Sequence, residues 1–166
     1  MNVITTSHIE TPLGPMIVGV IDDTICLLEF TDRKALESEI TMLQKTLSAQ
    51  MMSGIHPLFK TVQIQMKEYF EGKRKTFDLP QLHIGTEFER AIWKQLEGIP
   101  YGQTRSYLQV AQAAGVPRAV RAAACAIGMN KICIVIPCHR VIGSNGKLTG
   151  YSAGLARKMW LLELEK

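Results

Sequence analysis

The amino-acid sequence predicts an α+β protein with a small N-terminal strand-and-helix domain over residues 1–80. A mainly helical, winged helix-turn-helix-like C-terminal domain is expected over 86–166. Composition is the first indication, because 166 residues with 46% hydrophobic and 20% charged residues fit one globular domain or two small ones. The second is that β-branched apolar runs come early in the chain and helical spacings dominate later. The third is a segment at 76–85, punctuated by Pro80 and Gly85, which reads as a linker.

The N-terminal domain is predicted from two strands and two helices. Apolar runs at 16–20 and 24–30, separated by Asp22 and Asp23, predict strands joined by a turn. A helix is expected from residue 33 to about 50, since Leu36, Ile40, Leu43 and Leu47 recur at helical spacing. A second helix is expected from Pro57 to Phe70. No residue pattern here points to chemistry, so a structural role is expected.

Two capping boxes open the C-terminal domain. Thr86 with Glu89 predicts the start of a helix that buries Phe88, Ile92, Trp93 and Leu96 and ends near Gly98. Ser106 with Gln109 predicts a short helix that ends at Gly115. An alanine-rich helix is then expected from Pro117 to 126–128. A short helix, a glycine-containing turn and a second helix form the outline of a helix-turn-helix.

The charge of the chain is divided unevenly between its two halves. Residues 1–85 carry a net charge of −2 and residues 86–166 carry +6, and no acidic residue occurs from 98 to 162. Chance clustering is the alternative, but this interval favours a polyanionic partner. Arg118 and Arg121 are expected on one face of the alanine-rich helix. Its small residues allow close approach to a neighbouring helix or to a nucleic-acid groove, and the arginines favour the groove.

Cys138 and His139 are the residues best suited to chemistry. The apolar run 132–136 predicts a buried strand that Pro137 terminates, which delivers both side chains to an edge of the core. A cysteine reacts as its thiolate, and a nearby histidine can take the proton directly or through one water. Few acidic residues occur in this basic half, and Glu163 and Glu165, on the last predicted helix, are the carboxylates nearest in sequence to Cys138 and His139. Turn residues at 143–146, followed by Lys147, predict a basic loop, and a hairpin there would be the wing.

Several classes of protein are disfavoured. No apolar run reaches the roughly 20 residues of a membrane span, and residues 1–10 do not resemble a signal peptide. Four cysteines without a Cys-x-x-Cys pair predict reduced thiols in a cytoplasmic protein. No phosphate-binding glycine motif is present, so no nucleotide cofactor is expected. A zinc site from Cys125, Cys133, Cys138 and His139 is conceivable, but its spacing matches no common zinc motif, and no metal is expected.

The pentapeptide Pro137-Cys138-His139-Arg140-Val141 resembles the active-site signature of the O6-alkylguanine-DNA alkyltransferases. The resemblance is dense over 86–166 and covers the first 85 residues only in general layout. Further matches at the family's spacing are Ile99-Pro-Tyr-Gly102, Ser106-Tyr107, Arg121, Asn130, Gly150-Tyr-Ser152 and Trp160-Leu-Leu162.

This resemblance implies a DNA repair reaction that each protein molecule performs once. A monomer would bind double-stranded DNA through the minor groove and flip O6-alkylguanine out of the duplex, with O4-alkylthymine as a second substrate. Cys138 would accept the alkyl group irreversibly. His139 would act as base through a water, and Glu165 would orient His139. Tyr107 would donate a proton to the departing guanine.

The resemblance also implies a DNA-binding surface and a substrate pocket. Arg121 would enter the base stack, and Asn130 would brace the turn near the cysteine. Further DNA contacts would come from Arg118, Ser106, Ala122 and Ala123, and Leu148, Tyr151 and Ser152 would line the pocket together with Asn130. One departure is Lys131, which stands where the family usually has proline and would leave the turn after Asn130 looser.

Two other functions are compatible with parts of this pattern. A lesion-binding DNA module without chemistry would share the helix-turn-helix but would not need Cys138. A Cys-His hydrolase would need an oxyanion hole and repeated turnover, and it would not explain the interval without carboxylates. The range of alkyl groups and the preference for guanine over thymine stay open.

Overall fold

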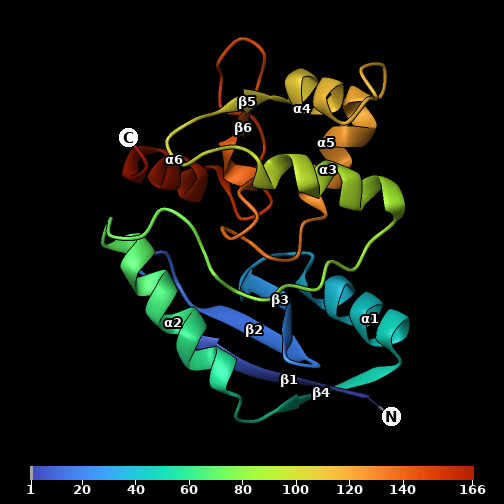
Figure 1. Ribbon diagram of the computed structural model, residues 1–166, viewed down its shortest axis with the longest axis vertical. Helices are drawn as coiled ribbons and strands as arrows, with labels where there is room; N and C mark the ends of the chain where they lie inside the picture. The colour runs from blue at the N-terminus through green and yellow to red at the C-terminus, as the bar shows by residue number, and fades with distance from the viewer. Residues whose placement is uncertain (1) are drawn as a thin grey trace. The chain divides into compact units, whose positions relative to one another are not determined.

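The computed structural model describes residues 2–166, which divide into two compact units (Figure 1). The N-terminal unit ends at Ile84, and the C-terminal unit runs from Gly85 to Lys166. Strands dominate the first unit and helices the second, which agrees with the α+β class expected from the sequence.

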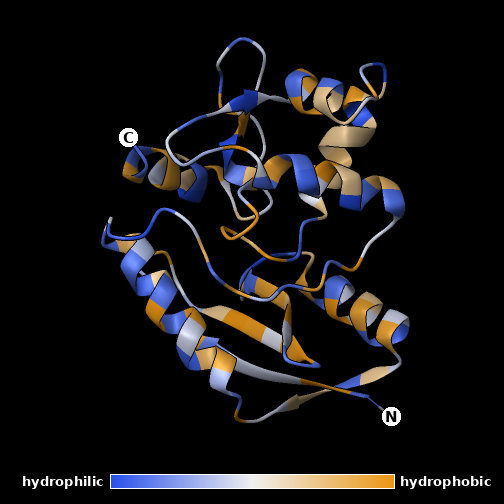
Figure 2. Ribbon diagram, viewed as in Figure 1, coloured by the Kyte–Doolittle hydropathy of each residue, from blue (hydrophilic) through white to orange (hydrophobic). Residues whose placement is uncertain are grey.

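The N-terminal unit is built on a four-stranded sheet with the strand order β3-β2-β1-β4. The first three strands are antiparallel, and β4 joins β1 in parallel. Residues of β1, β2, β3 and helix α1 share one hydrophobic cluster that contains Ile4, Leu27 and Leu43. Figure 2 shows this apolar character along β2, all of whose residues are buried. The elements are β1 (Asn2–Ile9), β2 (Met16–Ile21), β3 (Thr24–Phe30), α1 (Leu36–Leu47), β4 (Ala49–Ser53) and α2 (Pro57–Phe70).

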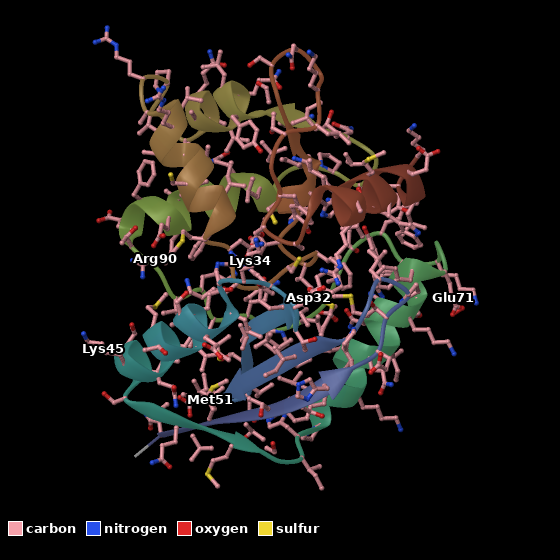
Figure 3. The ribbon with its side chains drawn as sticks, turned by 180° about the vertical axis from the view of Figure 1, so that it is seen from behind. Asp32, Lys34, Lys45, Met51, Glu71 and Arg90 are labelled. Carbon is pink, nitrogen blue, oxygen red and sulfur yellow. The ribbon has the colours of Figure 1, made fainter. Side chains whose placement is uncertain are left out.

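The predicted strands, the turn and the second helix of this unit are confirmed. Asp22 and Asp23 form the turn with positive φ angles of 48° and 59°. The first helix is shorter than expected, because Ser48 adopts a left-handed conformation that ends it. The chain then enters β4, a strand that the apolar pattern did not predict. Charged side chains such as Lys45 in α1 and Glu71 after α2 remain exposed (Figure 3).

The C-terminal unit consists mainly of helices. Both capping boxes are formed, at Thr86 and at Ser106. Helix α3 buries Ile92, Trp93 and Leu96, whereas Phe88 is only half-buried. The indole Nε1 of Trp93 donates to the carbonyl of Ala126 at 2.7 Å and ties α3 to α5. The elements are α3 (Glu87–Glu97), β5 (Arg105–Ser106), α4 (Tyr107–Ala113), α5 (Val120–Gly128), the 3-10 turn η1 (Cys138–Arg140), β6 (Val141–Ile142) and α6 (Leu155–Leu164).

The start of the alanine-rich helix differs from the prediction. Helix α5 begins at Val120, and Pro117 and Arg118 lie in the turn before it. Gly115 has a positive φ of 78°, and the Ala119 amide closes a turn on the carbonyl of Val116 at 2.9 Å. The expectation that Arg118 and Arg121 share a helix face is therefore wrong, because Arg118 is not helical.

The apolar run 132–136 is buried, as expected, but it is not a strand. Ile134 has a positive φ of 71°, and the Ile136 amide donates back to the carbonyl of Ile132 at 3.0 Å. The side-chain amide of Asn130 bonds both ends of this reversal, with its oxygen accepting from the Ile132 amide at 2.9 Å. Its nitrogen donates to the carbonyl of Ile136 at 3.1 Å. Local side-chain bonds of this kind compete with strand pairing and explain the difference.

The turn that follows the Cys-His segment is confirmed, but the hairpin is not. The Gly143 amide donates to the carbonyl of Lys147 at 2.9 Å, which closes the predicted turn. Strand β6 pairs in parallel with β5 across two residues instead of with a strand after the turn. The residues expected to form a wing are therefore a loop.

Candidate active site

Cys138 lies at a cavity of about 480 Å³ in the C-terminal unit. The 3-10 turn η1 positions it directly after Pro137, and its side chain is buried. Helix α4 contributes Tyr107 to the cavity wall, α5 contributes residues 124, 125, 127 and 128, and the loop before α6 contributes 149–152. Tyr107, Tyr151 and Ser152 thus line the same space as the cysteine. A cavity of this volume falls in the range typical of small-molecule sites.

Leu148 does not line this cavity, contrary to expectation. It lies at a separate cavity of about 450 Å³, together with Met159 and Leu162 of α6. Thr149 and Tyr151 of the same loop line the cavity at Cys138, whereas Leu148 lines the second cavity. Asn130 is also absent from the cavity wall, because it is buried behind the cysteine.

His139 is fully buried beside two charged residues. Its Nε2 lies 2.7 Å from Oε2 of Glu165, which comes from the end of α6, 26 residues further along the chain. Arg140 donates two hydrogen bonds to the same carboxylate, from Nε at 2.8 Å and from Nη2 at 3.1 Å. Its Nη1 also donates to the carbonyl of Ile99. The Glu165 carboxylate therefore contacts two buried side chains, the imidazole of His139 and the guanidinium of Arg140.

Burial favours the neutral form of His139. Burial lowers the pKa of His139 below its ordinary value, and the hydrogen bond to Glu165 opposes this only in part. A neutral imidazole that faces an Arg-bound carboxylate carries its proton on Nε2. Nδ1 is buried without a hydrogen-bond partner in the described chain, so its lone pair is available to accept a proton.

Asn130 contacts both the turn and Cys138. Besides its bonds to Ile132 and Ile136, its Nδ2 lies 3.4 Å from Sγ of Cys138. Lys131, which replaces the proline of the family pattern, is buried with Nζ 5.2 Å from the Trp93 ring centroid. The hydrogen bonds of Asn130 to Ile132 and Ile136 are therefore present although position 131 is lysine and not proline.

Lys158 is a site residue that sequence reasoning missed. Its side chain is fully buried, with Nζ 3.4 Å from the carbonyl of Gly150 and 5.9 Å from the Tyr107 ring centroid. Burial lowers the pKa of Lys158, and its attraction to the Cys138 thiolate opposes this shift. Helical spacing could have predicted this burial, because Lys158 lies on the same face of α6 as the buried residues Leu161 and Glu165.

The residues expected at a DNA interface fall into two groups. Arg118, Arg121 and Ala122 are exposed, and Ser106 is half-buried with its hydroxyl accepting from the Gln109 amide. Ala123 is wholly buried, so the expectation that it contacts DNA is wrong. The inward face of α5 contains Ala123, Ala126 and Ile127, which follow one another at helical spacing.

Neither a metal site nor a membrane span is found among residues 2–166. No group of three or more His, Cys, Asp or Glu side chains in this part of the chain could hold a metal ion. Cys133 instead contacts the hydroxyl of Tyr151 at 3.1 Å, and Cys125 is exposed at the cavity wall. No helix in the same range is long and apolar enough to cross a membrane.

Comparison with known proteins covers both units. A family model described as "6-O-methylguanine DNA methyltransferase, DNA binding domain" matches residues 87–166. A second, described as the "ribonuclease-like domain" of the same protein, matches residues 4–82.

Relatives and solved structures agree with these matches. A methylated-DNA–protein-cysteine methyltransferase of Methanosarcina barkeri is 40% identical over 159 residues, covering 95% of this chain and 94% of that protein. The constitutive enzyme of that name from Bacillus subtilis is 41% identical over 167 residues, covering 100% and 96%. The crystal structure of Mycobacterium tuberculosis OGT in complex with DNA has a TM-score of 0.82 at 37% identity, covering 99% and 92%. The chain therefore belongs to the O6-methylguanine-DNA methyltransferase family, also named methylated-DNA–protein-cysteine methyltransferases.

Proposed function

We propose that this protein repairs DNA by transferring the alkyl group of O6-alkylguanine to its own Cys138, once and irreversibly. The observation that carries the proposal is the cavity at Cys138, with the buried His139–Glu165–Arg140 group beside it. DNA is the partner, in keeping with the DNA-binding domain of the family and with the relative solved on DNA. The base must leave the stack to enter such a cavity.

The transfer is a displacement at the alkyl carbon. The Cys138 thiol gives its proton to Nδ1 of His139, directly or through one water, and Glu165 stabilises the imidazolium that forms. The thiolate attacks the alkyl carbon, so a carbon–sulfur bond forms while the carbon–oxygen bond to guanine breaks. The guanine keeps that electron pair and takes a proton from the hydroxyl of Tyr107. Lys158 favours the thiolate, and Asn130 holds the turn that presents it.

DNA binding is assigned to α4, α5 and the turn between them. Arg121 is exposed on α5 and has the reach to fill the space that a flipped base leaves. Ala122 beside it keeps the helix thin enough to enter the minor groove. Arg118 in the turn and Ser106 at the start of α4 contact the backbone phosphates. Tyr151 and Ser152 line the space for the base, and O4-alkylthymine is the second substrate.

The protein acts as a monomer in the cytoplasm. One chain contains the nucleophile, its base and the basic helix, so no second copy is needed to complete the site. A nucleophilic cysteine has to stay reduced, which the cytoplasm ensures.

The test is the stoichiometry of the reaction. Protein is incubated with excess duplex that contains O6-methylguanine and is analysed by intact and peptide mass spectrometry. We expect the mass of one methyl group per chain, on Cys138, followed by inactivity. A Cys26→Ala variant is the control, since Cys26 is buried in β3 with a pKa raised to about 11, and it should react normally. Repeated turnover, or methylation of another residue, would overturn the proposal.

A further inference from the structure

The hydroxyl of Tyr107 is held by the loop that precedes α6. Oγ1 of Thr149 donates to Oη of Tyr107 at 2.9 Å. Oη in turn donates to the carbonyl of Gly150 at 3.4 Å. All three residues line the cavity that contains Cys138. Thr149 lies just before the matched Gly150-Tyr-Ser152 motif, within the loop that the resemblance places at the substrate pocket.

These two hydrogen bonds determine in which direction the Tyr107 hydroxyl donates its hydrogen. A tyrosine hydroxyl has one hydrogen to donate and lone pairs that accept. Because Thr149 donates to the oxygen, the hydrogen of Tyr107 is left to point at an acceptor elsewhere. Gly150 is that acceptor here, at a distance where a hydrogen bond is weak. A base entering the cavity can therefore replace Gly150 as the acceptor at small cost.

The bond from Thr149 also suits the state that follows proton transfer. When the O–H bond of Tyr107 breaks and its proton moves to the guanine, the phenol oxygen becomes negative. Hydrogen bonds to a charged acceptor are about twice as strong as those between neutral groups. Thr149 keeps its own proton and strengthens its bond as the charge develops. Lys158 adds positive charge near the ring, but its Nζ donates to Gly150.

We propose that Thr149 is a positioning residue for alkyl transfer, which orients the hydroxyl of Tyr107 as a donor and stabilises its oxygen once the proton has left. This rests on the proposed function, in which Tyr107 protonates the departing base.

Two substitutions separate the hydroxyl from the shape of the side chain. Thr149→Val keeps the branched shape and removes the donor, whereas Thr149→Ser keeps the donor and removes the methyl group. In single-turnover reactions on saturating O6-methylguanine duplex, we expect Thr149→Val to be slower by about tenfold, the loss of one hydrogen bond to a developing charge. Thr149→Ser should stay within about twofold of the wild type. Equal slowing in both variants would overturn the proposal.

A double-mutant comparison tests whether Thr149 acts through Tyr107. In a Tyr107→Phe background, Thr149→Val should cause no further slowing, because the group that it positions is gone. Additive slowing would assign Thr149 a separate role and refute the inference.

A readout without substrate keeps the inference separate from the proposed function. In protein labelled with 13C at tyrosine Cζ, the Tyr107 signal should move in Thr149→Val and return in Thr149→Ser. An unchanged signal in Thr149→Val would show that the hydrogen bond is absent and would overturn the inference. If neither the wild type nor any variant takes up methyl groups, the proposed function fails. The Tyr107 signal then still reports the hydrogen bond from Thr149.

Discussion

Replacing Glu165 by glutamine is the perturbation that tests the buried charge group most directly. Glutamine has the shape of glutamate but no charge, so the variant keeps the packing at the end of α6. Glu165 is 4% exposed, and its carboxylate contacts His139 at 2.7 Å and accepts hydrogen bonds from Arg140 at 2.8 and 3.1 Å. Glu165→Gln leaves the Arg140 guanidinium buried without its anion.

The expected cost follows from that burial. Removing one partner of a buried ion pair destabilises a protein by about 3–5 kcal/mol, because the remaining charge stays desolvated. The glutamine carbonyl can still accept one bond from Arg140, so the lower end, about 3 kcal/mol, is expected. Total stabilities of about 5–15 kcal/mol leave the variant folded at neutral pH.

The assay is urea unfolding followed by tryptophan fluorescence. Both tryptophans, Trp93 and Trp160, belong to the C-terminal unit, so the signal reports the unit that contains Glu165. A loss of about 3 kcal/mol should lower the urea midpoint by at least about 1 M.

A second variant distinguishes an unpaired charge from lost packing. Adding Arg140→Met to Glu165→Gln removes the unpaired guanidinium, so part of the lost stability should return. Alkyl transfer should remain slower by about tenfold or more in both, since His139 loses the group that orients it. A cost below about 1 kcal/mol for Glu165→Gln, or no recovery in the double variant, would refute a desolvated ion pair.

Four further predictions concern DNA binding, transfer and pH. Cys138→Ser should abolish transfer but retain binding to alkylated duplex in a gel-shift assay; loss of both would make the cysteine structural. Arg121→Ala should slow saturated transfer from duplex by roughly ten- to a thousandfold but leave reaction with free O6-benzylguanine near wild type, since only the duplex reaction has to offset unstacking. Equal slowing on both substrates would indicate a folding defect instead. Affinity for duplex should fall steeply with salt in a fluorescence titration, because the basic residues displace counterions from phosphates, and an affinity independent of salt would contradict this. The pKa of His139 is lowered by burial, so the unfolded chain binds a proton first as pH falls below about 6.5, and the free energy of unfolding should decrease there. Urea titrations at pH 5 and 7.5 should show this decrease in the wild type and a smaller one in His139→Gln.

Local patterns in the sequence determined much of the secondary structure. Both capping boxes, the Asp22-Asp23 turn and the helix that starts at Pro57 were predictable, because each depends on residues a few positions apart. The family was also visible from the sequence, since its signature around Cys138 is contiguous.

The prediction failed where side chains override the local pattern. A β-branched run predicts a strand at 132–136, but the amide of Asn130 bonds that segment into a tight reversal. The proline at 117 and the alanine-rich composition also placed the start of α5 too early, because the helix begins at Val120.

The composition of the site was decided by tertiary structure. The family resemblance implied that Glu165 orients His139, but the sequence does not reveal that Arg140 binds the same carboxylate or that Lys158 is buried near Cys138. It also does not reveal that neighbours in one loop, Leu148 and Thr149, line different cavities. Periodicity specifies which face of an element is apolar, whereas burial and charge pairing depend on which elements pack together, and these come from distant parts of the chain.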